Sequence, residues 1–439
     1  MLKKKYYLSI ILLIVCVLFI SISVIEYPVN SVKTNNSSFI ESQDKVLVVA
    51  PHPDDEAIAC AGVIRYCTER NISVKIVVLT DGYLSASPMI RHDETVSAME
   101  LLGVKKDDII FLGYRDGTLP SLLNKNWESG NPYNLSGNIK SEYNFSYKQN
   151  STYSGDNLYS NLEEIISKFQ PTIIFYPDSE DEQIDHWAGN AFTEYVMAKT
   201  NYQGAGYTYI VHNPPDWPSP RTYNPEMGLT APEELTDLGY NWVYFPLNQY
   251  QQRLKESAFN LYSSQIKNTS FVRSFIRKNE IFATDQMVQI NSTPSSQRDM
   301  IRVIQEPTKK EHGKSSIRTR EIKSADFSLD NESAWLSINT RNNISMNTIY
   351  EVHILYLDNH NWGRIDVKIY DGILYYQKFQ DEGYDNQSEK VEIEGNQIKL
   401  KIPSEAFKDI NSFLISADII SGNTLIDWTG WRRVEIVGK

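Results

Sequence analysis

Apolar runs alternate with amphipathic stretches from Lys45 to about Ser264. Short apolar runs predict buried strands at Lys45–Ala50, Ser73–Leu79, Asp108–Leu112, Thr172–Tyr176 and Tyr207–Val211. Helical spacing predicts helices at Ala57–Glu69, Arg91–Leu102, Asn161–Phe169, Trp187–Ala198 and Gln249–Ser264. This order of strands and helices indicates an α/β fold, with a Rossmann-like, mostly parallel sheet and helices on both faces. Residues 120–156, rich in Asn, Ser, Gly and Tyr, are typical of a long loop.

The pattern changes after Ile290. Residues 291–316 contain Pro, Ser, Lys and Gly without periodicity, which predicts a linker. From Ile317 onward polar and apolar residues alternate, and turn sequences such as Asp371-Gly372 separate the runs. We expect strands at Tyr350–Leu357, Arg364–Tyr370, Ile373–Gln377, Lys390–Ile393, Gln397–Ile402, Phe413–Ile419 and Arg432–Val437. Such closely spaced short strands predict a β-sandwich-like domain over residues 317–439. Three of its tryptophans fit either sugar stacking or an aromatic core: Trp362, Trp428 and Trp431.

The N-terminus has the features of an export segment. Lys3-Lys4-Lys5 precede an apolar stretch, Tyr6–Ile25, that is long enough to cross a bilayer as a helix. The basic flank predicts a cytoplasmic N-terminus and an extracytoplasmic remainder. A cleaved signal peptide, with small residues at Ser21-Ile22-Ser23, is the alternative. We therefore expect an anchor or signal peptide at 1–26, a polar tether at 27–44, and a membrane-anchored or secreted protein.

Charge and cysteine content exclude some classes of protein. The net charge is −12, which argues against a nucleic-acid partner, because phosphate binding needs a basic surface. The three cysteines are Cys16, Cys60 and Cys67. The last two lie on one predicted helix, about 10 Å apart along its axis, which is too far for a disulfide. We expect two buried thiols and no disulfide framework.

A dense polar cluster follows the first predicted strand. His52, Asp54, Asp55 and Glu56 lie at its carboxyl end, where open α/β sheets place their ligands. A plain polar turn is the alternative, but so many charges at a sheet edge are costly without a partner. An imidazole nitrogen of His52 and a carboxylate oxygen of Asp55 suit Zn²⁺. Another carboxylate then remains to take a proton from water, as a metal hydrolase requires.

A third metal ligand must come from elsewhere in the chain. Of the seven histidines, three lie beyond the α/β region: His312, His353 and His360. The candidates that remain besides His52 are His92, His186 and His212. His186 follows the predicted strand Thr172–Tyr176 and an acidic loop, and it begins the next helix. It therefore lies at the same sheet edge as His52, and Asp185 beside it can orient a ligand. His92, by contrast, fits a surface position on its helix.

The sequence Pro-His-Pro-Asp-Asp-Glu at 51–56, followed later by Asp185-His186 at a helix start, resembles the PIG-L (LmbE-like) N-acetylglucosaminyl deacetylases. The resemblance extends over residues 45–285. Weaker supporting segments occur in the expected order: Leu79-Thr80-Asp81-Gly82, Arg91-x-x-Glu94, Leu101-Leu102-Gly103, Phe111–Gly117, Lys255-x-x-Ala258 and Tyr262-x-Ser264-Gln265. It implies a zinc-dependent deacetylase domain, which we place at 45–290.

The resemblance also implies roles for single residues. His52, Asp55 and His186 are expected to bind Zn²⁺, and Asp54 to act as the general base toward water at the metal. Hydroxide would attack an acetamide carbonyl and release acetate and a free amino sugar.

Two further residues are expected to face the substrate. Arg91 matches a substrate-contacting position of the family, although an ion pair with Glu94 on the same helix is the alternative. Asp116 is expected to face sugar hydroxyls, with a turn-forming role as its alternative.

One departure from the family pattern concerns catalysis. The family usually has His-x-Asp-His where this chain has Gln183-Ile184-Asp185-His186. That first His is thought to steady the oxyanion or act as an acid. Gln183 can donate a hydrogen bond but cannot carry a proton, and loss of an oxyanion donor costs about 10²–10³ in rate. We hypothesise that His212, at the end of the next predicted strand, takes over this role; a structural role is the alternative.

Together these observations predict a zinc-dependent hydrolase for the N-acetyl amide of an N-acetylglucosamine-type sugar in a glycolipid, glycan or glycoconjugate. Two alternatives stay open. One is a weakened or inactive glycan-binding protein on the same scaffold, suggested by Gln183. The other is a metallohydrolase that uses the same site on a different amide.

Overall fold

The computed structural model describes residues 39–437, apart from 214–216, 266–268, 285–286, 292–299, 308–318, 320, 331–332, 358–361 and 379–390. The predicted export segment at 1–26, Cys16 and most of the tether at 27–44 lie outside the described residues. Within the described residues, no helix combines the length and the apolar character needed to cross a bilayer. Residues Ile40–Lys439 form one compact unit.

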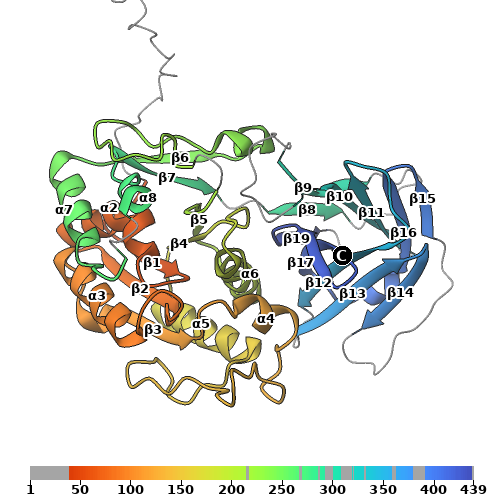
Figure 1. Cartoon of the computed structure of the whole chain (residues 1–439), viewed down its shortest axis with the longest axis horizontal. Coiled ribbons are helices and arrows are strands. Elements are labelled where there is room, and N and C mark those ends of the chain that lie inside the picture. The colour runs from red at the N-terminus through yellow and green to blue at the C-terminus, as the bar shows by residue number, and fades with distance from the viewer. Residues whose placement is uncertain are drawn as a thin grey trace, which may run out of the picture. The chain divides into compact units, whose positions relative to one another are not determined.

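A seven-stranded sheet carries the N-terminal half of this unit (Figure 1). Its order is β3-β2-β1-β4-β5-β7-β6. The strands are β1 (Lys45–Ala50), β2 (Ser73–Thr80), β3 (Ile109–Tyr114), β4 (Ile173–Pro177), β5 (Ala205–Tyr209), β6 (Trp242–Pro246) and β7 (Asn279–Thr284). The first five are parallel, and Val48 in the central strand pairs with Ile76 on one side and Phe175 on the other. The prediction of a mixed α/β fold with a mostly parallel sheet is confirmed, whereas the antiparallel strands β6 and β7 were not predicted.

Helices form two groups, one on each side of this sheet (Figure 1). The first group comprises α2 (Asp55–Glu69), α3 (Pro88–Leu101) and α7 (Gln249–Phe259), and the second comprises α4 (Leu119–Asn124), α5 (Gly155–Phe169) and α6 (Ile184–Lys199). The short helix α8 spans Thr269–Arg273. Helix α4 corrects the expectation of an uninterrupted loop at 120–156. It forms because Leu119, Leu122 and Leu123 bury themselves in the core while Pro120 occupies the first turn, where proline is tolerated.

Two further sheets occupy the C-terminal half. One has the order β15-β16-β11-β10-β9, and the other runs β14-β13-β12-β17-β19-β8, with β18 paired to β17. Their strands are β8 (Val288–Asn291), β9 (Ile301–Gln305), β10 (Ile322–Leu329), β11 (Ser333–Thr340), β12 (Thr348–Leu357), β13 (Trp362–Tyr370), β14 (Ile373–Lys378), β15 (Val391–Glu394), β16 (Gln397–Pro403), β17 (Ser412–Ser421), β18 (Thr424–Trp428) and β19 (Arg432–Val437). Apolar residues of both sheets, such as Phe327 and Ile415, share one core.

Strand β9 lies within the predicted linker at 291–316, of which residues 292–299 and 308–316 lie outside the described residues. This strand pairs antiparallel with β10 and buries Val303 and Ile304 in the C-terminal core. Only five residues long, it lies between polar segments, so no extended periodicity marks it in the sequence. Strands β10 and β11 lie within the predicted β-sandwich-like region at 317–439, although they were not among the individual strands predicted there.

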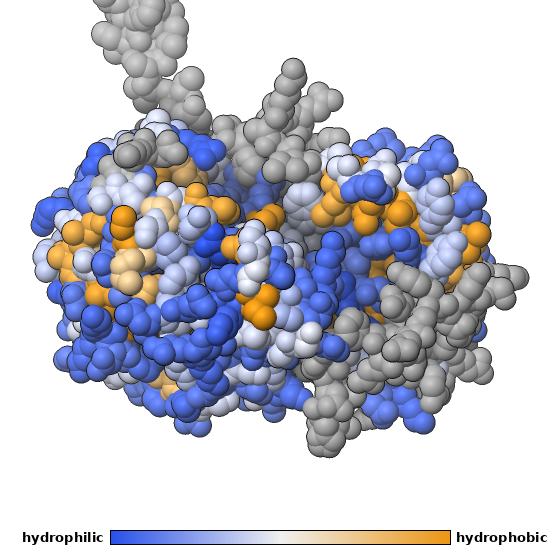
Figure 2. Space-filling model, turned by 60° about the horizontal axis from the view of Figure 1, so that its bottom comes forward, coloured by the Kyte–Doolittle hydropathy of each residue, from blue (hydrophilic) through white to orange (hydrophobic). Residues whose placement is uncertain are grey.

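Trp428 and Trp431 join the two halves of the unit. Both are buried in the same apolar cluster as Trp187 and Phe192 of helix α6. For these two tryptophans the core interpretation is therefore correct and sugar stacking is excluded. Figure 2 shows one face of the molecule, on which apolar residues are scattered among hydrophilic ones. The cysteine prediction is confirmed for Cys60 and Cys67, which are buried free thiols on α2.

His353 on β12 makes stability depend on pH. Burial alone would lower its pKa, but hydrogen bonds with Asp366 and Asp418 raise the pKa to about 9. The proton therefore stabilises the fold fully below the unfolded value of 6.5, and this contribution is lost as pH rises through 9. We expect His353 to contribute up to about 3 kcal/mol at low pH. Urea unfolding of wild type and His353→Gln should give a stability difference that shrinks between these two pH values; a constant difference would contradict the assignment.

Candidate metal centre

Polar side chains gather where the parallel strands end. His52 and Asp55 follow β1, Asp116 follows β3, the segment 178–186 follows β4, and His212 follows β5. Because parallel strands share one carboxyl edge, these residues meet although they are far apart in sequence. This confirms the expectation that His52 and His186 lie at the same edge of the sheet.

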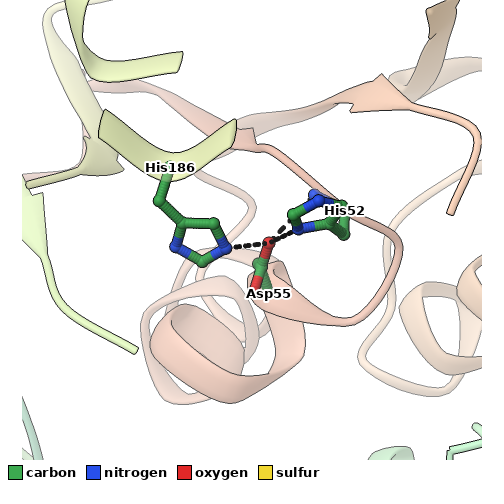
Figure 3. Close-up of side chains that lie close together, drawn as sticks. All are labelled: His52, Asp55 and His186. Atoms are coloured by element: carbon green, nitrogen blue, oxygen red, sulfur yellow. Dashed lines mark hydrogen bonds and ion pairs between the residues drawn. The ribbon is translucent and has the colours of Figure 1, made fainter. Parts of the chain in front are cut away.

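His52, Asp55 and His186 point toward one another (Figure 3). Asp55 Oδ2 lies 3.3 Å from His52 Nδ1 and 3.1 Å from His186 Nε2. One ligand atom from each residue lies within 4.8 Å of the other two. His186 is fully buried, yet neither of its ring nitrogens makes a well-aligned hydrogen bond among the described residues. Two imidazoles and a carboxylate in this arrangement fit three ligands of a tetrahedral Zn²⁺ site better than a hydrogen-bonded cluster.

A carboxylate stands behind each imidazole. His186 Nδ1 lies 3.0 Å from Asp181 Oδ2, and His52 Nε2 lies 3.1 Å from Asp185 Oδ2. Metal-binding histidines usually hold their second nitrogen against such a partner, which fixes the ring and its tautomer. Asp185 thus faces His52 rather than its chain neighbour. Asp181 was not predicted, because the sequence does not distinguish it from the other acids of the loop before His186.

Backbone N–H groups hold the carboxylates of Asp181 and Asp185 in place. Asp181 Oδ2 accepts hydrogen bonds from the backbone of Val211 at 2.7 Å and His212 at 3.0 Å. Asp185 accepts from Gly117 at 2.6 Å and from Leu119 at 3.0 Å. Through these hydrogen bonds, the positions of the loops after β3, β4 and β5 determine where the two carboxylates lie, and so how the rings of His52 and His186 are oriented.

The carboxylates create a strongly negative site. Burial alone would lower the pKa of His186, but the charges of Asp181 and Asp55 raise it to about 10. Burial would raise the pKa of Asp55, but the two imidazoles hold it well below its usual value. Positive charge is thus favoured between these side chains, which is the electrostatic condition for binding a divalent cation.

Asp54, the residue before the candidate ligand Asp55, has a strained backbone conformation. Its φ is 125°, in a region that L-residues rarely adopt. Such strain persists where the surroundings enforce it, and it is concentrated at functional sites. Burial raises the pKa of Asp54 to about 6, although the charge of Arg91 acts against this shift. The carboxylate borders a small cleft that Phe259, Tyr262 and other residues line. The Asp54 side chain is 15% exposed, so water can reach its carboxylate.

Arg91 is buried against Asp54. Its Nη2 lies 3.3 Å from Asp54 Oδ2 and also donates to the carbonyl of Pro53. Glu94 instead accepts hydrogen bonds from the hydroxyls of Ser263 and Ser264, so the predicted alternative of an Arg91–Glu94 pair is wrong. The geometry makes Arg91 a partner of Asp54.

Asp116 is mostly buried and lies next to His52. Its Oδ1 is 3.3 Å from His52 Nε2, and its Oδ2 accepts from the backbone of Leu84. Asp81, at the end of β2, supports this loop by accepting from the backbone of Asp116 and from the hydroxyl of Tyr143. Asp116 thus belongs to the surroundings of the candidate metal site, and its expected contact with sugar hydroxyls stays a prediction.

Gln183 and His212 flank the site from two sides. The side-chain oxygen of Gln183 caps helix α6 by accepting from the backbone of Asp185 and His186, and its Nε2 lies 3.2 Å from His52 Nε2. The His212 ring lies 5.0 Å from that of His186 and stacks on Phe271. The amide donor of Gln183 is therefore directed at the cluster. His92, predicted at the surface, is not part of it.

The His92 ring is mostly covered rather than exposed. It stacks on Phe145, 4.4 Å between centroids, and contacts Phe111. The expectation of a surface position is wrong for this side chain, because the loop at 120–156 folds over helix α3 and covers it.

Two segments that carry the family resemblance, those around Lys255 and Tyr262, pack near helix α2 without belonging to the metal site. Tyr262 donates its hydroxyl to Glu56, whose pKa burial raises to about 8. Lys255 forms a buried ion pair with Glu280, 2.7 Å between Nζ and Oε1. Tyr262 thus joins the segment after α7 to helix α2, and Lys255 joins α7 to β7. Glu280 on β7 also accepts from the backbone of Gly62 and Val63 in α2.

Known proteins resemble this region. Residues 47–197 match the family model PIG-L, GlcNAc-PI de-N-acetylase. A probable N-acetyl-alpha-D-glucosaminyl L-malate deacetylase 2 of Bacillus anthracis is 36% identical over 92 residues, which are 18% of this chain and 40% of that protein. The diacetylchitobiose deacetylase of Thermococcus kodakarensis is 38% identical over 85 residues, or 17% of this chain and 31% of that protein. The chain thus spans less than half the length of these curated relatives.

Among solved structures, N,N'-diacetylchitobiose deacetylase from Pyrococcus horikoshii, complexed with its inhibitor MPG, aligns with a TM-score of 0.35 and 21% identity. The alignment covers 55% of this chain and 83% of that one.

Proposed function

We propose, from the premise that residues 47–197 form a PIG-L family domain, that this chain is a zinc-dependent hydrolase of acetylated amino sugars. It would cleave the N-acetyl amide of an N-acetylglucosamine-type unit and release acetate and a free amine. The observation that carries the proposal is the convergence of His52, Asp55 and His186, with Asp54 as a further acid beside them.

The donor set fits zinc. His52, Asp55 and His186 supply two nitrogens and one oxygen, a ligand set found in catalytic zinc sites that keep one position open. Zn²⁺, when bound, supplies Lewis acidity, which polarises a carbonyl oxygen and makes water more acidic. Asp181 and Asp185 would hold the two imidazoles in the tautomer that leaves a lone pair for the metal.

Asp54 is the residue that we propose takes the proton from water. A general base needs an ionised oxygen within reach of the reacting water. Asp54 is the chain neighbour of the ligand Asp55, and its side chain is 15% exposed. Arg91, 3.3 Å away, stabilises its ionised form and fixes its orientation. Gln183 would donate its amide N–H toward the developing oxyanion, because its side-chain oxygen is already used to cap α6.

The substrate class rests on the relatives. Their names share an acetylated amino-sugar unit, attached either to malate or to a second sugar. We propose the same unit here, carried by a glycolipid, glycan or glycoconjugate. An extracytoplasmic location, with the chain anchored or secreted, is part of the proposal and rests on the sequence of residues 1–26 alone.

Acetate release tests the proposed function. Zinc-loaded protein is incubated with N-acetylglucosamine, diacetylchitobiose and an N-acetylglucosaminyl glycolipid, and acetate and free amine are measured together. We expect equal amounts of both products from at least one compound. Retention of the sugar without acetate would instead support the inactive glycan-binding alternative that Gln183 suggests. Release from acetylated amines that lack a sugar would support a different amide hydrolase.

His212→Ala tests whether His212 replaces the missing family histidine. We expect turnover to fall about 10²-fold, because the ring beside His186 would no longer stabilise the transition state. Zinc affinity should stay close to that of wild type, since His212 is not among the three ligands. His212→Gln, which keeps a hydrogen-bond donor, should recover part of the loss. Unchanged turnover of His212→Ala would disprove this role.

A further inference from the structure

Arg432, in the C-terminal half, forms hydrogen bonds with the loop that follows β4. Arg432 on β19 donates from Nη2 to Glu180 and from Nη1 to the hydroxyl of Ser179. Glu180 is fully buried and Arg432 nearly so. A buried carboxylate is stable only while a cation or several donors compensate its charge. Loss of Arg432 would remove the cation that pairs with Glu180 and would favour a movement of the loop toward water.

A close backbone approach completes this contact. A Cβ added at Gly430, in the turn before β19, would lie 2.3 Å from the carbonyl oxygen of Ser179. No side chain larger than hydrogen fits between the turn and the loop, so the two backbones pack directly on each other. The other side of the loop is fixed by Asp178, which accepts from the hydroxyls of Thr208 at 2.5 Å and Tyr240 at 3.1 Å.

This loop leads straight to the candidate metal centre. Asp181 follows Glu180 directly, and its carboxylate lies 3.0 Å from Nδ1 of His186. A shift of Glu180 would therefore move the group that orients the His186 ring.

A second arginine of the C-terminal sheets contacts helix α4, which lies near His52. Arg364 on β13 donates from Nη1 to the carbonyls of Leu123, at 3.2 Å, and Asn124, at 2.7 Å, at the end of helix α4. The first residue of α4, Leu119, donates its backbone N–H to Asp185, the carboxylate behind His52. Residues of the C-terminal sheets thus contact the segment next to Asp181, behind His186, and the helix whose backbone binds Asp185, behind His52.

We propose that the C-terminal sheets brace the metal centre, and that Arg432 is a positioning residue that keeps Asp181 in place behind His186. The proposal rests on the proposed function, because it assumes that His186 binds zinc. It gives the C-terminal half a role within the chain itself rather than as a separate sugar-binding module.

Zinc affinity of the full chain tests the brace. Dissociation constants are measured by competition with a chromophoric chelator, and Co²⁺-loaded protein gives the absorption spectrum of the site. For Arg432→Gln we expect about 10- to 100-fold weaker zinc binding and an altered cobalt spectrum. Arg432→Lys, which keeps the charge, should lose less. Glu180→Gln breaks the same pair from the loop side, and combining it with Arg432→Gln should weaken binding less than additively.

Arg433→Gln is the matched control. Arg433 is the next residue on β19 and pairs with Glu194 of α6 at 3.2 Å, so its loss also breaks an ion pair between the two halves, but the partner lies on helix α6 rather than in the loop at 178–181. Its zinc affinity should stay within about twofold of wild type. Should Arg432→Gln fail to fold, Glu180→Gln replaces it with the same expected loss.

Wild-type affinity and spectrum in either pair-breaking variant would overturn the brace alone. A wild-type protein that binds no zinc would overturn the brace and the proposed function together. Zinc binding without acetate release would remove only the proposed function, and the affinities of the variants would still decide the brace.

Discussion

Asp54→Asn should reduce turnover by about 10²–10⁴-fold and leave zinc binding nearly unchanged. Asn has the same shape but cannot accept a proton, and it tolerates a positive φ better than most residues, so the strained turn at φ 125° is kept. The metal ligands His52 and Asp55 retain their positions, because they belong to the same turn and helix start. The measurement is the initial rate of acetate release at saturating substrate, with the zinc content of each preparation.

Asp107→Asn is the control for this change. Asp107 is an exposed acid in the short turn before β3, and its substitution should leave both rate and zinc content within about twofold of wild type. Full activity of Asp54→Asn would show that another group takes the proton. Loss of zinc in the same variant would show instead that Asp54 helps to hold the metal.

His186→Ala should abolish zinc binding at ordinary concentrations. Removal of a partner that only orients a ligand already costs about 10- to 100-fold in affinity, so loss of the ligand itself should cost at least about 100-fold. Turnover should disappear with the metal. The substitution also removes the His186 imidazole from the buried carboxylates of Asp181 and Asp55, so the variant should unfold at lower urea concentration.

His92→Ala provides the comparison, since it removes an imidazole of the same domain that stacks on Phe145 rather than on the cluster. It should lower stability but keep zinc and activity. If His186→Ala retained one zinc per chain with unchanged affinity, the ligand set would have to be assigned differently.

The local sequence predicted the parts of the fold that depend on local pattern. Lys45–Ala50 is a strand with the predicted bounds, because an uninterrupted apolar run suits the fully buried centre of a parallel sheet. Helix α2 begins two residues before its predicted start at Ala57, because the carboxylates of Asp55 and Glu56 are favoured in a first helical turn. The meeting of His52 and His186 followed from topology alone, since both come after parallel strands.

Features that depend on contacts between residues far apart in the chain could not be predicted from the sequence. Asp181 looked like one of several acids in a loop, and only the fold places it behind His186. The pair between Glu180 and Arg432 joins residues 252 positions apart, and no periodicity in either segment indicates it. Likewise β9 becomes a strand because β10 offers it a paired edge and a core to fill. Such non-local contacts override weak local preference.

The most direct test is a zinc titration of chelator-stripped protein in which acetate release is recorded at each addition. It tests together that His52, Asp55 and His186 bind zinc and that the bound zinc is needed for deacetylation. If His52, Asp55 and His186 form one catalytic zinc site, metal-free protein should be inactive, and activity should rise linearly to a break at one equivalent of Zn²⁺ per chain. Undiminished acetate release from metal-free protein, or a fully zinc-loaded protein that releases none from any acetylated amino sugar, would contradict it.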